Sequence, residues 1–140
     1  MRQILLFAAL AASLALLSGC ALSKAKEDKA EDMPDKAAYH KLSAEEAYEM
    51  MASQEVVVVD VRTREEYDGG HIENAVLVPN ESIVSEMPEA LPDKEATLLV
   101  YCRSGRRSKD AAQKLLVLGY QSVYDFGGVI DWPYELVKEG

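Results

Sequence analysis

The stretch Thr97-Leu98-Leu99-Val100-Tyr101-Cys102-Arg103-Ser104-Gly105-Arg106-Arg107-Ser108 decides the fold, because an apolar run leads directly into a polar, basic loop. Residues 97–101 are predicted to form a central strand. A helix is predicted to follow at once, since residues 111–118 have an apolar face that ends at Gly119-Tyr120. Cys102 is therefore expected at the carboxyl end of a strand, which is the edge where open α/β sheets bind ligands.

The flanking segments repeat this alternation of strand and helix. Further strands are predicted from apolar runs at residues 56–59, 76–78 and 123–124. Further helices are predicted at residues 44–52 and 64–68, each after a capping box, and at residues 129–137 around Trp132. We therefore predict an α/β fold in three layers, with a mostly parallel sheet and helices on both faces.

The first residues indicate export. An apolar run from Ile4 to Leu17 follows a basic start and is too short to span a bilayer, which is typical of a signal peptide. Leu17-Ser18-Gly19-Cys20 resembles a bacterial lipobox, which implies removal of residues 1–19 as a signal peptide and lipidation of Cys20. We expect a lipoprotein anchored in a membrane, at the periplasmic face (the outer membrane included) or at the outer face of the cell membrane. The alternative is an ordinary secretory signal cut elsewhere.

Charge and length define the rest of the chain. Residues 20–40 are predicted to be the lipidated cysteine and a charged linker, and residues 41–140 to form one domain. The whole chain has 15 basic and 24 acidic side chains, a formal net charge of -9. Loss of residues 1–19 removes Arg2 and leaves 14 basic and 24 acidic side chains, or -10. We expect no nucleic acid partner for so acidic a chain.

Cys102 is the candidate nucleophile. A thiolate is favoured by positive charge and by N–H groups at the start of a helix, and the segment 103–109 supplies three arginines and a lysine. Lipidation of Cys20 would leave Cys102 as the only thiol, so no internal disulfide is expected. The alternative is a buried cysteine acting as a small hydrophobe, which the polar flanking residues disfavour.

Four groups of residues together resemble the single-domain rhodanese-like sulfurtransferases, over about residues 42–140. They are Val59-Asp60-Val61-Arg62, then Tyr67 with Gly70-His71-Ile72 and Asn74-Ala75, then the Cys102 loop, then Gly127-Gly128 with Trp132. One departure is Glu73-Asn74, where the family often has Pro-Gly, and we interpret it as a tolerated turn variant. The resemblance implies a rhodanese-like fold.

The resemblance also implies a transferase of the thiosulfate sulfurtransferase (rhodanese) type. Cys102 would be the catalytic cysteine, taking a sulfane sulfur from a small anionic donor such as thiosulfate as a persulfide. Cyanide or a thiol, including a protein sulfur acceptor, would then remove that sulfur. Substrate would be bound by the loop residues Arg103, Ser104, Gly105, Arg106 and Arg107. No metal and no organic cofactor is implied.

Four residues are expected to support the site: Asp60, Arg62, His71 and Ser108. Arg107 is predicted to pair with Asp60. His71 is predicted to have a hydrogen-bonding role and not to act as a base. Two interpretations stay open for the side chains of Arg103 and Arg106: they contact the donor anion, or they are exposed to solvent.

Two other functions stay open. Cysteine-dependent phosphatases and arsenate reductases use Cys-x5-Arg, whereas here four residues separate Cys102 from Arg107, a loop sized for sulfur rather than for a tetrahedral oxyanion. The other alternative is a non-enzymatic persulfide carrier or a binding and sensing module, because a fold does not determine a function.

Overall fold

The computed structural model describes residues 37–138. The predictions for the signal peptide, for Cys20 and for most of the linker therefore lie outside the described residues. Among residues 37–138, no helix is both long enough and apolar enough to cross a membrane.

A single parallel sheet forms the centre of the domain. Its strands are β1 (Ala38–Lys41), β2 (Val57–Asp60), β3 (Val76–Leu77), β4 (Thr97–Cys102) and β5 (Ser122–Gly128). Their order across the sheet is β1-β5-β4-β2-β3, and every neighbouring pair is parallel. The polar loop after β4 therefore starts at the middle of the sheet edge.

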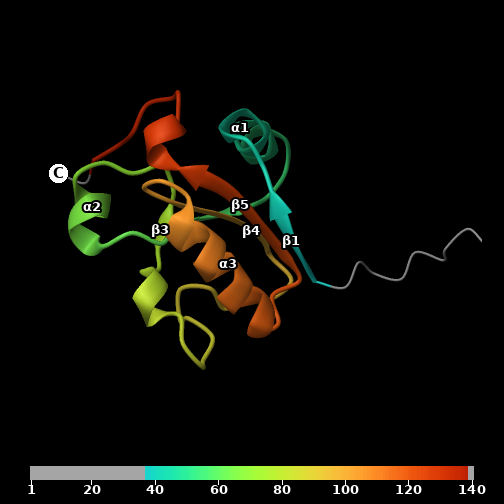
Figure 1. Cartoon of the computed structure of the whole chain (residues 1–140). Coiled ribbons are helices and arrows are strands. Elements are labelled where there is room, and N and C mark those ends of the chain that lie inside the picture. Colours follow the sequence, from blue (N-terminus) through green and yellow to red (C-terminus); the bar gives the residue numbers. More distant parts are fainter. Residues whose placement is uncertain (1–36, 139–140) are drawn as a thin grey trace, which may run out of the picture. The chain divides into compact units, whose positions relative to one another are not determined.

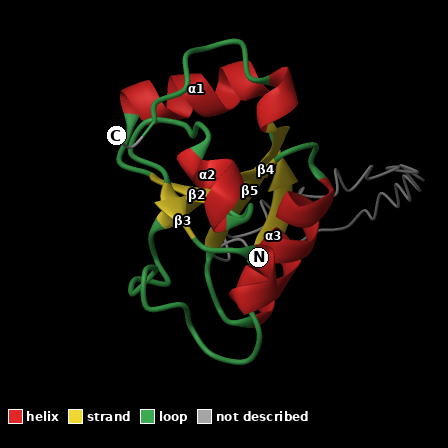
Figure 2. Ribbon diagram, turned by 90° about the vertical axis from the view of Figure 1, so that its left-hand side faces the viewer, coloured by secondary structure: helices red, strands yellow, loops and turns green. Residues whose placement is uncertain are grey.

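Helices cover both faces of the sheet, which confirms the predicted fold class. They are α1 (Ala44–Ser53), α2 (Arg64–Asp68) and α3 (Arg106–Val117), with 3-10 turns η1 (Asn80–Ser82) and η2 (Val129–Asp131). Figure 2 shows α1 and α3 on opposite sides of the strands. Ala111, Ala112 and Leu115 of α3 pack in one core cluster, whereas Ala47 of α1 and Tyr67 of α2 pack in another.

Helix ends follow the signals in the sequence. Both capping boxes form, because Ser43 and Glu46 exchange side-chain and backbone hydrogen bonds before α1, and Thr63 and Glu66 do so before α2. Beyond α3, Gly119 adopts φ +96° and its N–H donates to the Leu116 carbonyl. A left-handed glycine of this kind ends a helix without steric cost.

The first strand was not predicted. β1 begins at Ala38 and pairs with β5 from Ala38↔Ser122 to Lys41↔Asp125, so the domain starts before the predicted boundary at Lys41 (Figure 1). His40, assigned to the linker, lies in this strand and stacks on Tyr124 with ring centroids 4.8 Å apart. A short edge strand with polar residues lacks the apolar run that marks the inner strands.

The predicted helix over residues 129–137 is wrong. Only Val129–Asp131 form a 3-10 turn, and Trp132 is extended at φ -78° and ψ 112°. Pro133 explains the difference, because proline lacks a backbone N–H and disfavours helical backbone in the residue before it. The segment then continues to Val137, which forms an antiparallel bridge with His71.

Candidate active site

Cys102 lies at the carboxyl end of β4, where the chain turns into α3. Its side chain is buried, with the residue only 1% exposed. The backbone N–H of Gly105 donates a hydrogen bond to the Cys102 sulfur at 3.0 Å. The three residues between β4 and α3, Arg103 to Gly105, therefore curl round the thiol at the centre of the sheet edge.

The surroundings of Cys102 favour its ionised form. Burial raises the pKa of the thiol, but the N–H groups of Ser108, Gly105 and Ser104 outweigh it and lower the pKa below its usual range. Hydrogen bonds to a charged form stabilise that form. A group of donors that holds a thiolate can also hold a second anionic sulfur bonded to it.

Two glycines allow the loop to close around the sulfur. Gly105 has φ +96°, a conformation that side chains rarely adopt. Gly128 is the last residue of β5, and a β-carbon there would lie 2.2 Å from the carbonyl oxygen of Arg103. Gly127-Gly128 lies at the end of β5, where the backbones of this strand and the loop come close together.

The arginines of the loop differ in their surroundings. Arg103 and Arg106 are exposed, as is Ser104, so their side chains face solvent. Arg107 is partly buried and forms two hydrogen bonds with Glu66 of α2, from its two terminal nitrogens at 2.7 and 2.8 Å. The prediction that Arg107 pairs with Asp60 is wrong. Asp60 has a different partner.

That partner is Arg62, two residues along the chain. The Arg62 guanidinium contacts both Asp60 oxygens, at 2.6 Å for Nη2 to Oδ2, and also donates to the Gly70 carbonyl at 2.8 Å. Tyr101 donates its hydroxyl to Asp60 Oδ2 at 2.5 Å. Asp60 and Arg62 are both buried, and their hydrogen bonds to Tyr101 and Gly70 join β2, β4 and the turn after α2.

His71 supports the same turn. Its Nδ1 lies 2.9 Å from the Tyr67 carbonyl oxygen, and its ring stacks on the Tyr67 ring with centroids 3.7 Å apart. Tyr67 in turn donates its hydroxyl to the Ala75 carbonyl at 2.7 Å. These contacts assign His71 a hydrogen-bonding role in the turn of residues 67–75.

Behind the loop lies a group of four residues, Asp125, Ser108, Tyr39 and Lys41, which we call the Asp125 cluster. The sequence indicated only Ser108 among them. The buried Asp125 carboxylate accepts hydrogen bonds from the Ser108 and Tyr39 hydroxyls, both at 2.6 Å, and from Lys41 Nζ at 3.1 Å. The cluster links α3, β5 and β1. A signal was present in the alternate polar residues Tyr39 and Lys41 and in one acidic residue within an apolar strand.

The stability that the Arg107–Glu66 ion pair contributes should depend on pH. The hydrogen bonds from Arg107 lower the pKa of Glu66 from 4.5 to about 2. Because the pKa of this carboxyl is lower in the folded than in the unfolded protein, its ionisation stabilises the folded state at pH values above the unfolded pKa. This stabilisation is lost as the pH falls through the folded pKa. Glu66→Gln, which keeps the capping box, should lower the free energy of unfolding by about 1 kcal/mol at pH 7, after allowance for partial exposure.

Urea denaturation of both proteins at pH 7, 5, 4 and 3 measures this difference, which should shrink as the pH falls. Glu65→Gln is the matched control, because Glu65 lies in the same turn but is exposed. An equal difference between wild type and Glu66→Gln at every pH would contradict the ion pair as its cause.

The model of the rhodanese-like domain matches residues 43–133, from the cap of α1 to the segment after η2. The chain belongs to the rhodanese-like family. The match includes the Cys102 loop and Gly127-Gly128.

Solved structures resemble this rhodanese-like domain over most of the described residues. A rhodanese-related protein from Thermoplasma volcanium has a TM-score of 0.62 and 28% identity, with 72% of this chain and 100% of that chain covered. A rhodanese with anions from E. coli has a TM-score of 0.55 and 34% identity, with 61% and 100% covered. A human single-domain sulfurtransferase has a TM-score of 0.58 and 28% identity, with 66% and 93% covered.

Curated relatives are longer. The tRNA uridine(34) hydroxylase of Yersinia pestis (strain Pestoides F) is 32% identical over 106 residues, which cover 72% of this chain and 30% of that protein. The enzyme of Yersinia enterocolitica is 31% identical over the same length. The rhodanese-like domain thus spans about a third of the length of these relatives.

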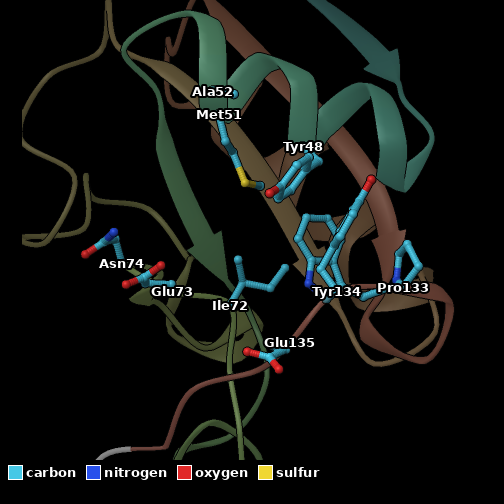
Figure 3. A pocket seen from close by; sticks show the side chains of 10 residues that line it. Tyr48, Met51, Ala52, Ile72, Glu73, Asn74, Pro133, Tyr134 and Glu135 are labelled. Atoms are coloured by element: carbon cyan, nitrogen blue, oxygen red, sulfur yellow. The ribbon is translucent and has the colours of Figure 1, made fainter.

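A hollow of about 640 Å³ lies away from the Cys102 loop of the rhodanese-like domain, between α1, the turn after His71 and the C-terminal segment (Figure 3). Tyr48 and Tyr134 stack there with ring centroids 3.9 Å apart.

Within residues 37–138 no group of three or more His, Cys, Asp or Glu side chains is arranged to hold a metal ion.

Proposed function

We propose that this rhodanese-like domain is a sulfurtransferase of the thiosulfate sulfurtransferase type, with Cys102 as its nucleophile. One observation carries the proposal: the Cys102 sulfur lies at the central strand end, accepts a hydrogen bond from Gly105, and has a lowered pKa. A thiolate in a ring of N–H donors is a good nucleophile and a good site for an anionic sulfur.

The reaction has two balanced steps. In the first, the Cys102 thiolate attacks the outer sulfur of thiosulfate, the S–S bond of thiosulfate breaks, and sulfite leaves with the bonding electrons. In the second, cyanide or a thiolate attacks the terminal sulfur of the Cys102 persulfide and regenerates the thiolate. The thiolate and the persulfide each carry one negative charge on sulfur, so the loop stabilises the same charge in both forms of the enzyme.

The loop arginines have separate parts in this proposal. Arg103 and Arg106 are exposed and attract the donor anion, while the backbone N–H groups of the loop hold the persulfide. Arg107 is bound to Glu66 at 2.7 Å and is less available to a tetrahedral oxyanion, which counts against phosphatase or arsenate reductase chemistry. The E. coli rhodanese described with anions supports an anionic donor.

Hydroxylation of tRNA is not proposed for this chain. The relatives that carry this name are longer, and the similarity covers only 30% of their length. The rhodanese-like domain shared with them is compatible with sulfur transfer and with persulfide carriage. A carrier without turnover is the second candidate, and it would form the same persulfide.

Steady-state kinetics distinguish these functions. We expect thiocyanate from thiosulfate and cyanide, with mercaptopyruvate and a glutathione persulfide compared as donors at equal concentration. Phosphate release from p-nitrophenyl phosphate should stay at the background rate. Phosphate release without any thiocyanate would contradict the proposal, and persulfide formation without turnover would favour the carrier.

We also propose that the mature chain is exported and anchored by lipid at Cys20, on the periplasmic face or the outer face of the cell membrane. The support is the apolar run of residues 4–17 followed by Leu17-Ser18-Gly19-Cys20. Mass spectrometry of the N-terminal peptide from the producing cells should find an acylated Cys20 as first residue. An unmodified Cys20 inside a longer peptide would contradict this.

A further inference from the structure

Lys41 carries the one positive charge of the Asp125 cluster. An ionised carboxylate is costly to bury unless it is paired and hydrogen-bonded. Asp125 is fully buried, and the other two side chains that bind it, Ser108 and Tyr39, are neutral donors. Burial and the Asp125 carboxylate raise the pKa of Tyr39, which stays protonated and keeps donating. The charge of Asp125 is therefore balanced by Lys41 alone within the cluster.

Lys41 also lies against the loop that surrounds Cys102. A β-carbon at Gly127 would lie 3.4 Å from Lys41 Nζ, and one at Gly105 would lie 4.0 Å from it. Gly105 is the residue whose N–H binds the Cys102 sulfur. The ammonium is therefore close to a backbone segment that contacts the sulfur directly, while half of the Lys41 side chain remains exposed at 53%.

Asp125 is linked to Cys102 indirectly, through Ser108 of α3. Its Oδ1 accepts from the Ser108 hydroxyl at 2.6 Å and from the Gly127 N–H at 2.9 Å. Ser108 is in the first turn of α3, and its N–H is among the groups that favour the Cys102 thiolate. A charge at Asp125 is therefore felt at Cys102 through a buried path of low dielectric.

We propose that Lys41 and Asp125 form a charge pair that sets the reactivity of the Cys102 thiolate, with Lys41 as a positioning residue of the active site. The proposal rests on the function proposed above and names a residue that controls it. Without Lys41, the unbalanced carboxylate disfavours a second negative charge on Cys102. Without the Asp125 charge, Lys41 favours that charge, so the two substitutions act in opposite directions.

Other charged groups lie on the elements that meet at the loop, and the experiment leaves them unchanged. They are Arg103, Arg106, Arg107, Lys109 and Asp110 in the loop and α3, Glu66 in α2, Glu81 in η1 and Asp131 in η2. A shift seen on substitution of Lys41 or Asp125 therefore reports the pair.

The pH dependence of Cys102 alkylation by iodoacetamide tests the proposal, and it needs no sulfur donor. The Cys102 peptide of the full chain is quantified by mass spectrometry, so that Cys20 does not contribute. Lys41→Met should raise the midpoint of the alkylation profile by about half a pH unit or more, and Lys41→Arg should keep the wild-type midpoint. Asp125→Asn, which can still accept from Ser108 and Gly127, should lower the midpoint.

An unchanged midpoint in Lys41→Met would overturn the proposal, even if its unfolding temperature fell, because a structural contact alone would give that result. Shifts of Lys41→Met and Asp125→Asn in the same direction would overturn it as well. A failure of the proposed function looks different: the alkylation midpoints would move as expected, but thiosulfate would leave no sulfur on wild-type Cys102.

Discussion

Gly128→Ala should lower kcat/KM for sulfur transfer by about 100-fold or more, because a displacement of about 1 Å at a reacting group has that effect. The added β-carbon would lie 2.2 Å from the Arg103 carbonyl oxygen and 2.6 Å from the Ser104 Cα. These are backbone atoms, so the whole loop around Cys102 must move. We also expect a loss of about 2 to 3 kcal/mol in unfolding free energy, typical of overpacking.

Gly69→Ala is the matched control for Gly128→Ala. Gly69 follows α2 with φ -68°, and a β-carbon there would meet nothing nearer than the Glu65 carbonyl oxygen at 3.4 Å. The unfolding free energy of the Gly69→Ala protein should change by no more than about 0.5 kcal/mol, and its turnover should be normal. Thiocyanate assays and urea denaturation measure both variants. Normal turnover in Gly128→Ala would show that the loop does not depend on this close approach.

Arg62→Met should lower the free energy of unfolding by about 3 to 5 kcal/mol, since it leaves a buried charge without its counter-ion. Asp60 is fully buried, and the Arg62 side chain is only 6% exposed. Methionine keeps much of the apolar volume of arginine, so the lost interactions are those with the Asp60 carboxylate and the Gly70 carbonyl. Denaturant unfolding at pH 7 measures the loss.

Arg64→Met is the control for Arg62→Met, because it removes an arginine from an exposed ion pair. Arg64 also pairs with an aspartate, Asp68, at 3.6 Å, but the two side chains are 65% and 51% exposed. Exposed pairs contribute about 0 to 1 kcal/mol, so Arg64→Met should be nearly as stable as wild type. Equal destabilisation by Arg62→Met and Arg64→Met would show that the buried pair has no special weight.

The inner strands and the helix caps were predictable because their causes are local. Val57–Asp60 and Thr97–Cys102 are covered on both faces, so they contain apolar runs that a sequence shows directly. The boxes of Ser43 with Glu46 and of Thr63 with Glu66 need only residues three apart. The position of Cys102 followed from the strand before it.

The remaining features depend on contacts that are distant in the sequence. Arg107 was predicted to pair with Asp60, but it pairs with Glu66 of α2 because Arg62 occupies Asp60. Strand β1 lies at the edge of the sheet and contains no apolar run. In the sequence it was therefore not distinguished from the charged segment before it. Lys41 became visible as part of the site only through its contact with Asp125.

Cys102 lies between two groups that each have a buried carboxylate, the Asp60–Arg62 pair and the Asp125 cluster. The most direct measurement is an intact mass spectrum of the protein after incubation with thiosulfate and removal of excess donor, with Cys102→Ser as the control. The account predicts that wild type gains the mass of one sulfur atom, that cyanide removes it, and that Cys102→Ser gains nothing. A wild-type protein without added sulfur, or a Cys102→Ser variant that still acquires it, would contradict the account.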